Sequence, residues 1–169
     1  SSADRIAAVW PTRFSAGSAR PYVRQAKKLA NFVYNGRMGN LLGSSDGWDF
    51  RGRGLIQITG RDNYARASRF LGVDFVANPD LVKAPEYAAP ILVLGMAEGW
   101  FTGRNLGDVF KPGLRVSDGD WDRARGIVNG DVKRVGAELR KLSNDYLTAL
   151  TVGDWDVSPA LPPPPPSQA

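Results

Sequence analysis

Apolar residues recur at helical spacing in several stretches of this chain. In the clearest stretch, residues 132–150, apolar side chains follow one another at steps of three or four residues, which places them on one face of a helix. They are Val132, Val135, Leu139, Leu142, Tyr146 and Leu150. A second stripe predicts a helix over residues 19–34, with Pro21 in its first turn. That stripe consists of Tyr22, Ala26, Leu29 and Val33.

Two shorter helices are predicted together with the residues that end them. Residues 2–10 begin with Ser2, a good N-terminal cap, and stop before Pro11. Residues 61–71 stop at Gly72, which favours the left-handed conformation that closes helices. The side chains expected to face inward from this helix are Tyr64, Ala67, Ser68 and Leu71.

The remaining pattern is also helical, with little sign of β-structure. Residues 85–101 are mostly apolar, which predicts a largely buried helix that Pro90 kinks unless it lies in the first turns. Residues 118–128 form a further helix candidate, and only residues 55–59 alternate as a strand does. We therefore predict a mainly α fold with at most a small β-hairpin near residues 50–60.

The segment 46–64 concentrates hydrogen-bonding groups among glycines. Gln57 and Thr59 are two residues apart, so in an extended segment their side chains point to the same side. With Asn63 they form a row of uncharged donors and acceptors, which suits sugar hydroxyls and N-acetyl groups. The alternative is a hydrogen-bonded network that only supports the loop.

The amino-acid composition limits the kinds of catalytic and metal site that the chain can form. The chain has no histidine and no cysteine, which removes nearly every usual zinc site and every Ser-His-Asp or Cys-His arrangement. Acid–base chemistry must then come from Asp or Glu, and we expect no metal and no cofactor. The net charge of +5 favours anionic partners, but the charges are scattered and resemble no nucleic-acid motif. No apolar run reaches the roughly 18 residues that a membrane span needs.

The order of residues in the glycine-rich segment carries a family resemblance. An aromatic at Phe50, Gly-Arg-Gly at 52–54, Gln-Ile-Thr at 57–59 and then Asn63-Tyr64 resemble the signature of plant-type chitinases and the related phage and bacterial endolysins. Weaker similarities extend the match over roughly residues 2–150, at 31–40, 78–81, 85–89, 95–103 and 124–130. The resemblance implies a lysozyme-like helical domain with a cleft.

The resemblance also suggests roles for particular residues. Gln57, Thr59 and Asn63 match positions that bind sugar and help to hold the attacking water. Arg53 matches a residue that orients a catalytic carboxylate; the alternative is a structural salt bridge with Asp49 or Asp62. Asn129 matches an asparagine on the far wall of the cleft, or else it caps a helix or turn. Tyr64 matches a position near the cleft, although helix packing explains it equally well.

One aromatic residue is a candidate sugar contact on its chemistry. Trp48 can stack on a pyranose ring, because an aromatic face suits the apolar face of a sugar. The alternative is core packing beside the glycine-rich turn.

The two catalytic glutamates of the family have no match on this chain. Both precede a stretch that resembles residues 2–11, so they are expected from sequence ahead of Ser1, and the chain by itself is predicted to be inactive. Of the carboxylates present, Glu98 is expected in a buried helix, where burial would raise its pKa. Neither it nor the others match a catalytic position; these are Glu86, Glu138, Asp46 and Asp49.

The resulting hypothesis is the C-terminal portion of a glycoside hydrolase, over residues 1–157, with a disordered Pro-rich tail at 158–169. It is expected to act on β-1,4-linked N-acetylated amino sugars by an inverting two-carboxylate mechanism. Peptidoglycan is the first substrate and chitin the second, for a bacterial or phage-encoded protein acting at the cell wall. The alternatives are a non-catalytic glycan-binding or structural virion component and, less favoured, a basic module that binds nucleic acid.

Overall fold

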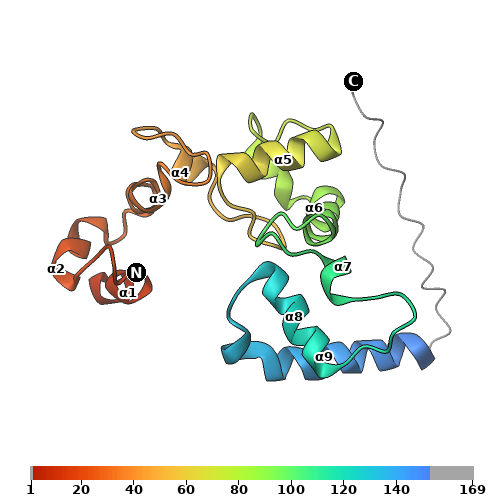
Figure 1. Ribbon diagram of the computed structural model, residues 1–169. Helices are drawn as coiled ribbons and strands as arrows, with labels where there is room; N and C mark the ends of the chain where they lie inside the picture. Colours follow the sequence, from red (N-terminus) through yellow and green to blue (C-terminus); the bar gives the residue numbers. More distant parts are fainter. Residues whose placement is uncertain (1, 153–169) are drawn as a thin grey trace. The chain divides into compact units, whose positions relative to one another are not determined.

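The computed structural model describes residues 2–152, and the predicted Pro-rich tail lies outside them (Figure 1). The chain divides into two compact units, residues 1–88 and 89–169, with the division inside the helix α6 (Pro85–Ala97). Between residues 2 and 152 the elements are helices, and the one β-pairing is an isolated antiparallel bridge between Arg53 and Ile58. The prediction of a mainly helical fold is therefore confirmed. Within these same residues, no helix is both long and apolar enough to cross a membrane.

The first unit opens with short helices around a small apolar core. The helix α1 (Ala3–Val9) is capped as predicted by Ser2, whose Oγ accepts a hydrogen bond from the Arg5 amide at 3.2 Å. It is followed by α2 (Ala16–Ala19), the 3₁₀ turn η1 (Arg20–Tyr22) and α3 (Ala26–Tyr34). The buried side chains that hold these elements together are Ile6, Phe14, Ala19 and Val33.

The prediction of one continuous helix over residues 19–34 is wrong. Val23 is extended and Arg24 adopts a left-handed conformation with φ of 59°, which separates η1 from α3. The break allows the rings of Tyr22 and Phe32 to meet with centroids 5.0 Å apart. In an unbroken helix ten residues would separate them by about 15 Å along the axis. Aromatic packing in the folded unit therefore outweighs the helical spacing of apolar residues over 19–34.

The rest of the first unit positions the glycine-rich segment. The helix α4 (Asp46–Asp49) lies against α3, and Asn31 and Asn35 of that region accept hydrogen bonds from the Trp48 and Gly47 amides, both at 2.8 Å. The helix α5 (Arg61–Leu71) has the predicted limits and ends at Gly72, with φ of 66°. The 3₁₀ turn η2 (Pro79–Lys83) then leads into α6.

The helix α6 is shorter than predicted. It ends at Ala97, because the Trp100 amide donates to the Gly95 carbonyl at 2.9 Å across the left-handed Gly99, the pattern of a glycine-closed helix end. Glu98 therefore lies just outside the helix and is exposed. The expectation that Glu98 is buried in an apolar helix is wrong.

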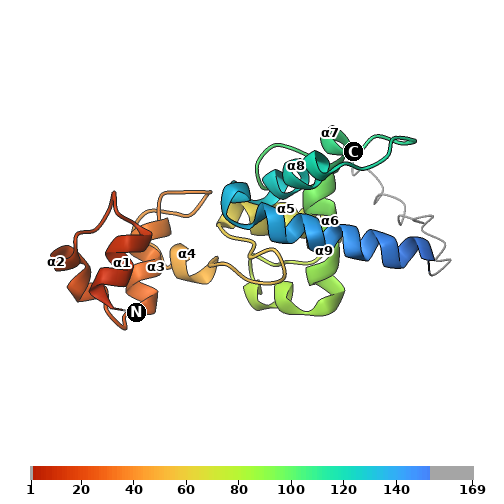
Figure 2. The ribbon, with the colours of Figure 1, turned by 90° about the horizontal axis from the view of Figure 1, so that it is seen from below.

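The second unit contains α7 (Leu106–Val109), α8 (Asp118–Val128) and α9 (Val132–Val152). The helix α9 lies where the hydrophobic spacing predicts it, and α8 matches the helix candidate at residues 118–128. Figures 1 and 2 show α8 against α9, with the last turns of α9 extending beyond it. The ion pair from Arg140 to Asp122, 2.6 Å long, joins the two helices. The predicted stripe of α9 is partly buried in its first half, whereas Leu142, Tyr146 and Leu150 are exposed.

Candidate functional site

The predicted strand at residues 55–59 is a tight turn closed by the single bridge. Arg53 and Ile58 exchange backbone hydrogen bonds of 3.3 and 2.9 Å, and the chain reverses between them. Gly54 and Gln57 both have positive φ, of 69° and 55°. The expectation of an extended strand here is wrong, because the left-handed conformation at Gly54 reverses the chain at once.

The turn nevertheless brings the predicted polar residues together. A Cβ atom added to Gly52 would lie 3.0 Å from Oε1 of Gln57 and 3.4 Å from Oγ1 of Thr59, so both side chains face the space that glycine leaves. Thr59 Oγ1 donates to the Gln57 carbonyl, and Asn63 Nδ2 donates to the Thr59 carbonyl, each at 2.8 Å. We call Gln57, Thr59 and Asn63 the polar row.

The polar row is open to solvent and keeps hydrogen-bonding capacity for a ligand. Gln57 is exposed, and Thr59 and Asn63 are half-buried. The Gln57 amide nitrogen donates to the Gly54 carbonyl at 3.0 Å, which turns its Oε1 acceptor toward the space beside Gly52. The donation by Thr59 likewise leaves the lone pairs of its hydroxyl as acceptors.

Arg53 is buried and holds a carboxylate, but its partner is one that the sequence did not suggest. Its Nε donates to Oδ1 of Asp80 at 2.7 Å, and its Nη1 donates to the backbone carbonyl of Asp49 at 2.5 Å. Asp80 is 67% exposed, and hydrogen bonds from Lys83 and Arg53 hold the pKa of its carboxyl below the ordinary value of 3.8. The Asn-Pro-Asp-Leu motif at 78–81 is the one sequence signal that pointed to this region.

Tyr64 supports the segment from inside the unit. It has no exposed surface and packs against Phe50 with ring centroids 5.2 Å apart. Its hydroxyl donates to the Arg51 carbonyl at 2.8 Å and accepts from Arg53 Nη1 at 3.0 Å. Burial raises the pKa of the phenol above its ordinary value of 10.0. This geometry fits the helix-packing alternative, and the Tyr64 hydroxyl joins Arg51 to Arg53 from inside the unit.

Asn129 belongs to the second unit. It caps the C-terminal end of α8 in an extended conformation, and its amide donates to the Arg125 carbonyl at 3.0 Å. Its side chain is exposed. Asn129 therefore occupies the helix-capping position that the sequence analysis gave as the alternative to a cleft-wall role. Its exposed side-chain amide remains available to a ligand.

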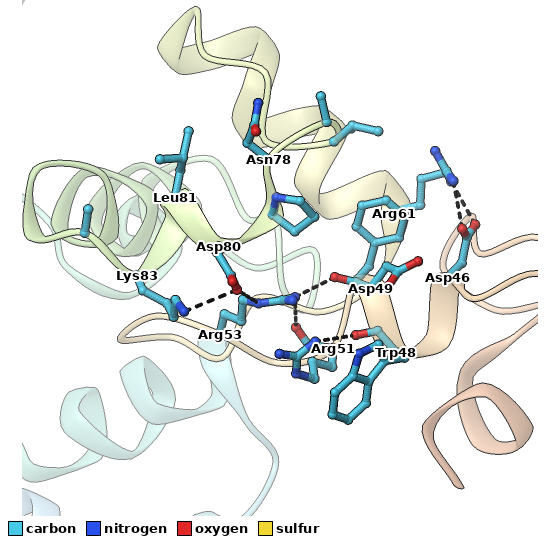
Figure 3. Close-up of a pocket in the computed structure, with 15 residues that line it drawn as sticks. Asp46, Trp48, Asp49, Arg51, Arg53, Arg61, Asn78, Asp80, Leu81 and Lys83 are labelled. Carbon is cyan, nitrogen blue, oxygen red and sulfur yellow. Dashed lines mark hydrogen bonds and ion pairs between the residues drawn. The ribbon is translucent and has the colours of Figure 1, made fainter. Parts of the chain in front are cut away.

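Trp48 lies at a pocket of about 870 Å³ that the polar row does not enter (Figure 3). The pocket is formed by α4, the segment that follows it, Arg61 and the η2 region; its lining residues are Asp46, Trp48, Asp49, Phe50, Arg51, Arg53, Arg61, Val76, Ala77, Asn78, Pro79, Asp80, Leu81, Lys83 and Ala84. Arg51 and Arg53 line it, whereas the intervening Gly52 faces Gln57 and Thr59. The pocket and the polar row therefore lie on opposite sides of the 51–53 segment.

At the edge of this pocket, the buried carboxylate of Asp46 forms a bidentate ion pair with Arg61. Arg61 donates to its two oxygens at 2.7 and 2.8 Å, and the Leu41 amide adds a bond of 2.9 Å. These bonds, with the Arg61 contribution the largest, hold the pKa of the Asp46 carboxyl below 3.8. Asp46 is thus fully engaged in joining the 36–45 loop to α5.

Comparison with known proteins gives a consistent result. A model of the chitinase class I family matches residues 11–103, more than half of the chain. A glycosyl hydrolase family 19 domain-containing protein of Haemophilus influenzae is 52% identical over 60 residues, 34% of this chain and 29% of that protein. An acidic 27 kDa endochitinase of Solanum lycopersicum is 52% identical over 46 residues, 27% of this chain and 17% of that protein.

A third relative, an endochitinase of Arabidopsis thaliana, is 37% identical over 69 residues, 40% of this chain and 22% of that protein. The chain thus spans less than a third of the length of each of these curated relatives.

Proposed function

Because the chain belongs to the chitinase class I family of glycoside hydrolases, we propose that it is part of an enzyme that hydrolyses β-1,4 bonds between N-acetylated amino sugars. The observation that carries this proposal is the polar row. Its three side chains come from the segment of the family signature: Gln57 and Thr59 face the space beside Gly52, and Asn63 is hydrogen-bonded to the Thr59 carbonyl.

The polar row has the chemistry to bind a sugar and to position a water molecule. Oε1 of Gln57 and Oγ1 of Thr59 are acceptors that face the same space. A water that donates both protons to them keeps its lone pairs directed away, toward an anomeric carbon. Asn63 adds an amide for a sugar hydroxyl or N-acetyl group. In this proposal Arg53 and Tyr64 hold the backbone of the turn. The sugar contacts expected of Trp48 and Asn129 stay predictions, since Trp48 lies at the pocket and Asn129 belongs to the second unit.

The general acid and base are proposed to come from protein sequence ahead of Ser1. An inverting glycosidase needs an acid with a raised pKa and a base about 6.5–9.5 Å away. Asp46 and Asp80 do not suit the role of the acid, because ion pairs lower the pKa of both carboxyls. Residues 1–157 then form the C-terminal portion of the catalytic domain.

The proposed substrates are peptidoglycan first and chitin second, since both contain β-1,4-linked N-acetylated amino sugars. The flanking sequence favours peptidoglycan through its endolysin-like segments. The names of the plant relatives, in contrast, refer to chitin. Binding and cleavage of both polymers therefore need to be measured side by side.

The first experiment measures binding of N-acetylglucosamine tetramer by calorimetry. Gln57→Ala should weaken binding about tenfold, as expected for the loss of a hydrogen bond, while the melting temperature changes little. Gln25→Ala is the matched control, because Gln25 is exposed and caps α3 without a side-chain hydrogen bond. Unchanged affinity in Gln57→Ala would remove the polar row from the site.

Turnover is tested on the same preparation. The 169-residue chain should bind oligosaccharide without cleaving it, and a longer polypeptide with the upstream sequence should cleave it. Turnover by the chain itself that a single Asp or Glu substitution abolishes would contradict the assignment of the acid and base. Binding without turnover in the longer polypeptide would instead indicate a non-catalytic glycan-binding protein.

A further inference from the structure

Four cationic side chains line the pocket in Figure 3, and within residues 2–152 one of them lacks a carboxylate partner. Arg61 pairs with Asp46, while Arg53 and Lys83 share Asp80, at N···O distances of 2.7 to 3.2 Å. Arg51 forms no ion pair with any described residue. The lining holds these four cations against the three carboxylates of Asp46, Asp49 and Asp80, so one positive charge is left in excess.

Arg51 is also held in place. Its guanidinium lies 4.0 Å from the centre of the Trp48 ring, and its Nη1 donates to the Trp48 carbonyl at 2.9 Å. The side chain is half-buried, so it is partly removed from water while most of its five N–H donors stay uncommitted. A guanidinium fixed by stacking loses little rotamer freedom on binding, and its planar fork matches a carboxylate.

We propose that this pocket binds a carboxylate of a peptidoglycan stem peptide, with Arg51 as the principal contact. The inference rests on the proposed function and deepens it, because it distinguishes between the two polymers. Chitin carries no ionised group, whereas the peptides attached to peptidoglycan end in and contain carboxylates. Lys83, which is 56% exposed, adds attraction for an anion at the same pocket.

The position of the pocket is compatible with a branched ligand. Gly52 faces the polar row, while Arg51 and Arg53 on either side of it face the pocket. A glycan strand on the polar row and a peptide on the other side of the 51–53 segment would occupy separate surfaces. The two contacts can then be measured independently.

The test uses the 169-residue chain and three ligands: intact peptidoglycan, the glycan strands that remain after an amidase has removed the peptides and freed the lactyl carboxylate of each muramic acid, and chitin. Arg51→Gln should weaken binding to intact peptidoglycan about tenfold and leave binding to the other two ligands unchanged. Arg13→Gln removes the same charge from an exposed site outside the pocket and should have no such effect. Arg51→Lys keeps the charge without the planar fork and should bind intact peptidoglycan at an intermediate level.

A measurement on the wild-type chain covers the case in which Arg51→Gln does not fold. A soluble stem peptide containing D-glutamate and diaminopimelate should bind the wild type, and its fully amidated form should bind at least tenfold more weakly. Equal binding of the two peptides would overturn the inference, as would equal losses in folded Arg51→Gln and Arg13→Gln. Failure of the tetramer to bind the polar row, with peptide binding intact, would count against the proposed function alone.

Discussion

At the scale of single residues, two aspartates with equally short ion pairs differ in how much they stabilise the protein. Asp46 and Arg61 lie 2.7 Å apart with the carboxylate buried, and Asp145 and Lys141 lie 2.7 Å apart on the surface of α9. Water screens the exposed pair, so its contribution is small. The buried carboxylate of Asp46 has lost its hydration on folding, and only the hydrogen bonds from its protein partners compensate for that loss.

We therefore expect Asp46→Asn to lower the free energy of unfolding by about 2 kcal/mol at about pH 7, an amount reduced from that of a fully buried pair because Arg61 is 34% exposed. Asp145→Asn, the control, should change stability little. Urea denaturation measures both. An Asp46→Asn protein as stable as the wild type at neutral pH would show that the ion pair is dispensable.

The pH dependence of this effect follows from the direction of the pKa shift. The pKa of Asp46 is lowered in the folded state, so its contribution is fully present above the ordinary value of 3.8 and disappears as pH falls through the lower folded value. The stability difference between wild type and Asp46→Asn should shrink between about pH 5 and about pH 2.

At the scale of elements, α5 begins and ends at glycines with different constraints. Gly60, before its first residue, has φ of 89°, and an added Cβ would lie 2.4 Å from Cβ of Met38. Gly72, after its last residue, has φ of 66° and no heavy atom within 4 Å of an added Cβ. One glycine is needed for conformation and close contact, and the other for conformation alone.

Gly72→Ala should therefore destabilise the protein by about 1 kcal/mol, the cost of a left-handed alanine. Gly60→Ala should cost at least about 3 kcal/mol, because backbone strain and a steric clash add. Thermal unfolding followed by circular dichroism compares the two. Equal losses would mean that the 38–39 loop moves aside easily.

Some features of the elements could be predicted from neighbouring residues in the sequence, and others depend on residues far away in the chain. The limits of α5 follow from hydrophobic spacing and from the glycine that ends the segment. The break at Arg24 depends on the contact of Tyr22 with Phe32, and the partner of Arg53 is 27 residues away at Asp80. Such long-range pairings leave no periodic trace in the sequence. The sequence predicted the polar row on a strand; the structure places Gln57 and Thr59 side by side at a tight turn beside Gly52, and the sugar-binding role of the row stays a prediction.

At the scale of the whole molecule, the net charge of +5 bears on the choice of substrate. An anionic polymer is attracted by this charge and a neutral one is not, and salt screens the attraction over about 8–10 Å at moderate ionic strength. The two polymers can thus be distinguished by ionic strength as well as by mutation.

Binding to intact peptidoglycan should weaken several-fold as NaCl rises from about 50 to about 500 mM, whereas binding of the neutral N-acetylglucosamine tetramer should stay constant. Sedimentation with the polymer and calorimetry with the tetramer give the two series. Equal salt dependence for both ligands would show that the charge of the protein does not select between them.

The left-handed conformation of Gln57 has a consequence for laboratory evolution. Glutamine is strained at φ of 55°, while glycine is not, so replacement by glycine relaxes the backbone. Selection for heat resistance alone would therefore enrich glycine at this position and discard the amide that we propose binds the sugar. If the proposed role of Gln57 holds, a thermostable variant obtained in that way would keep its fold and bind oligosaccharide more weakly, so selection for binding belongs in the same round.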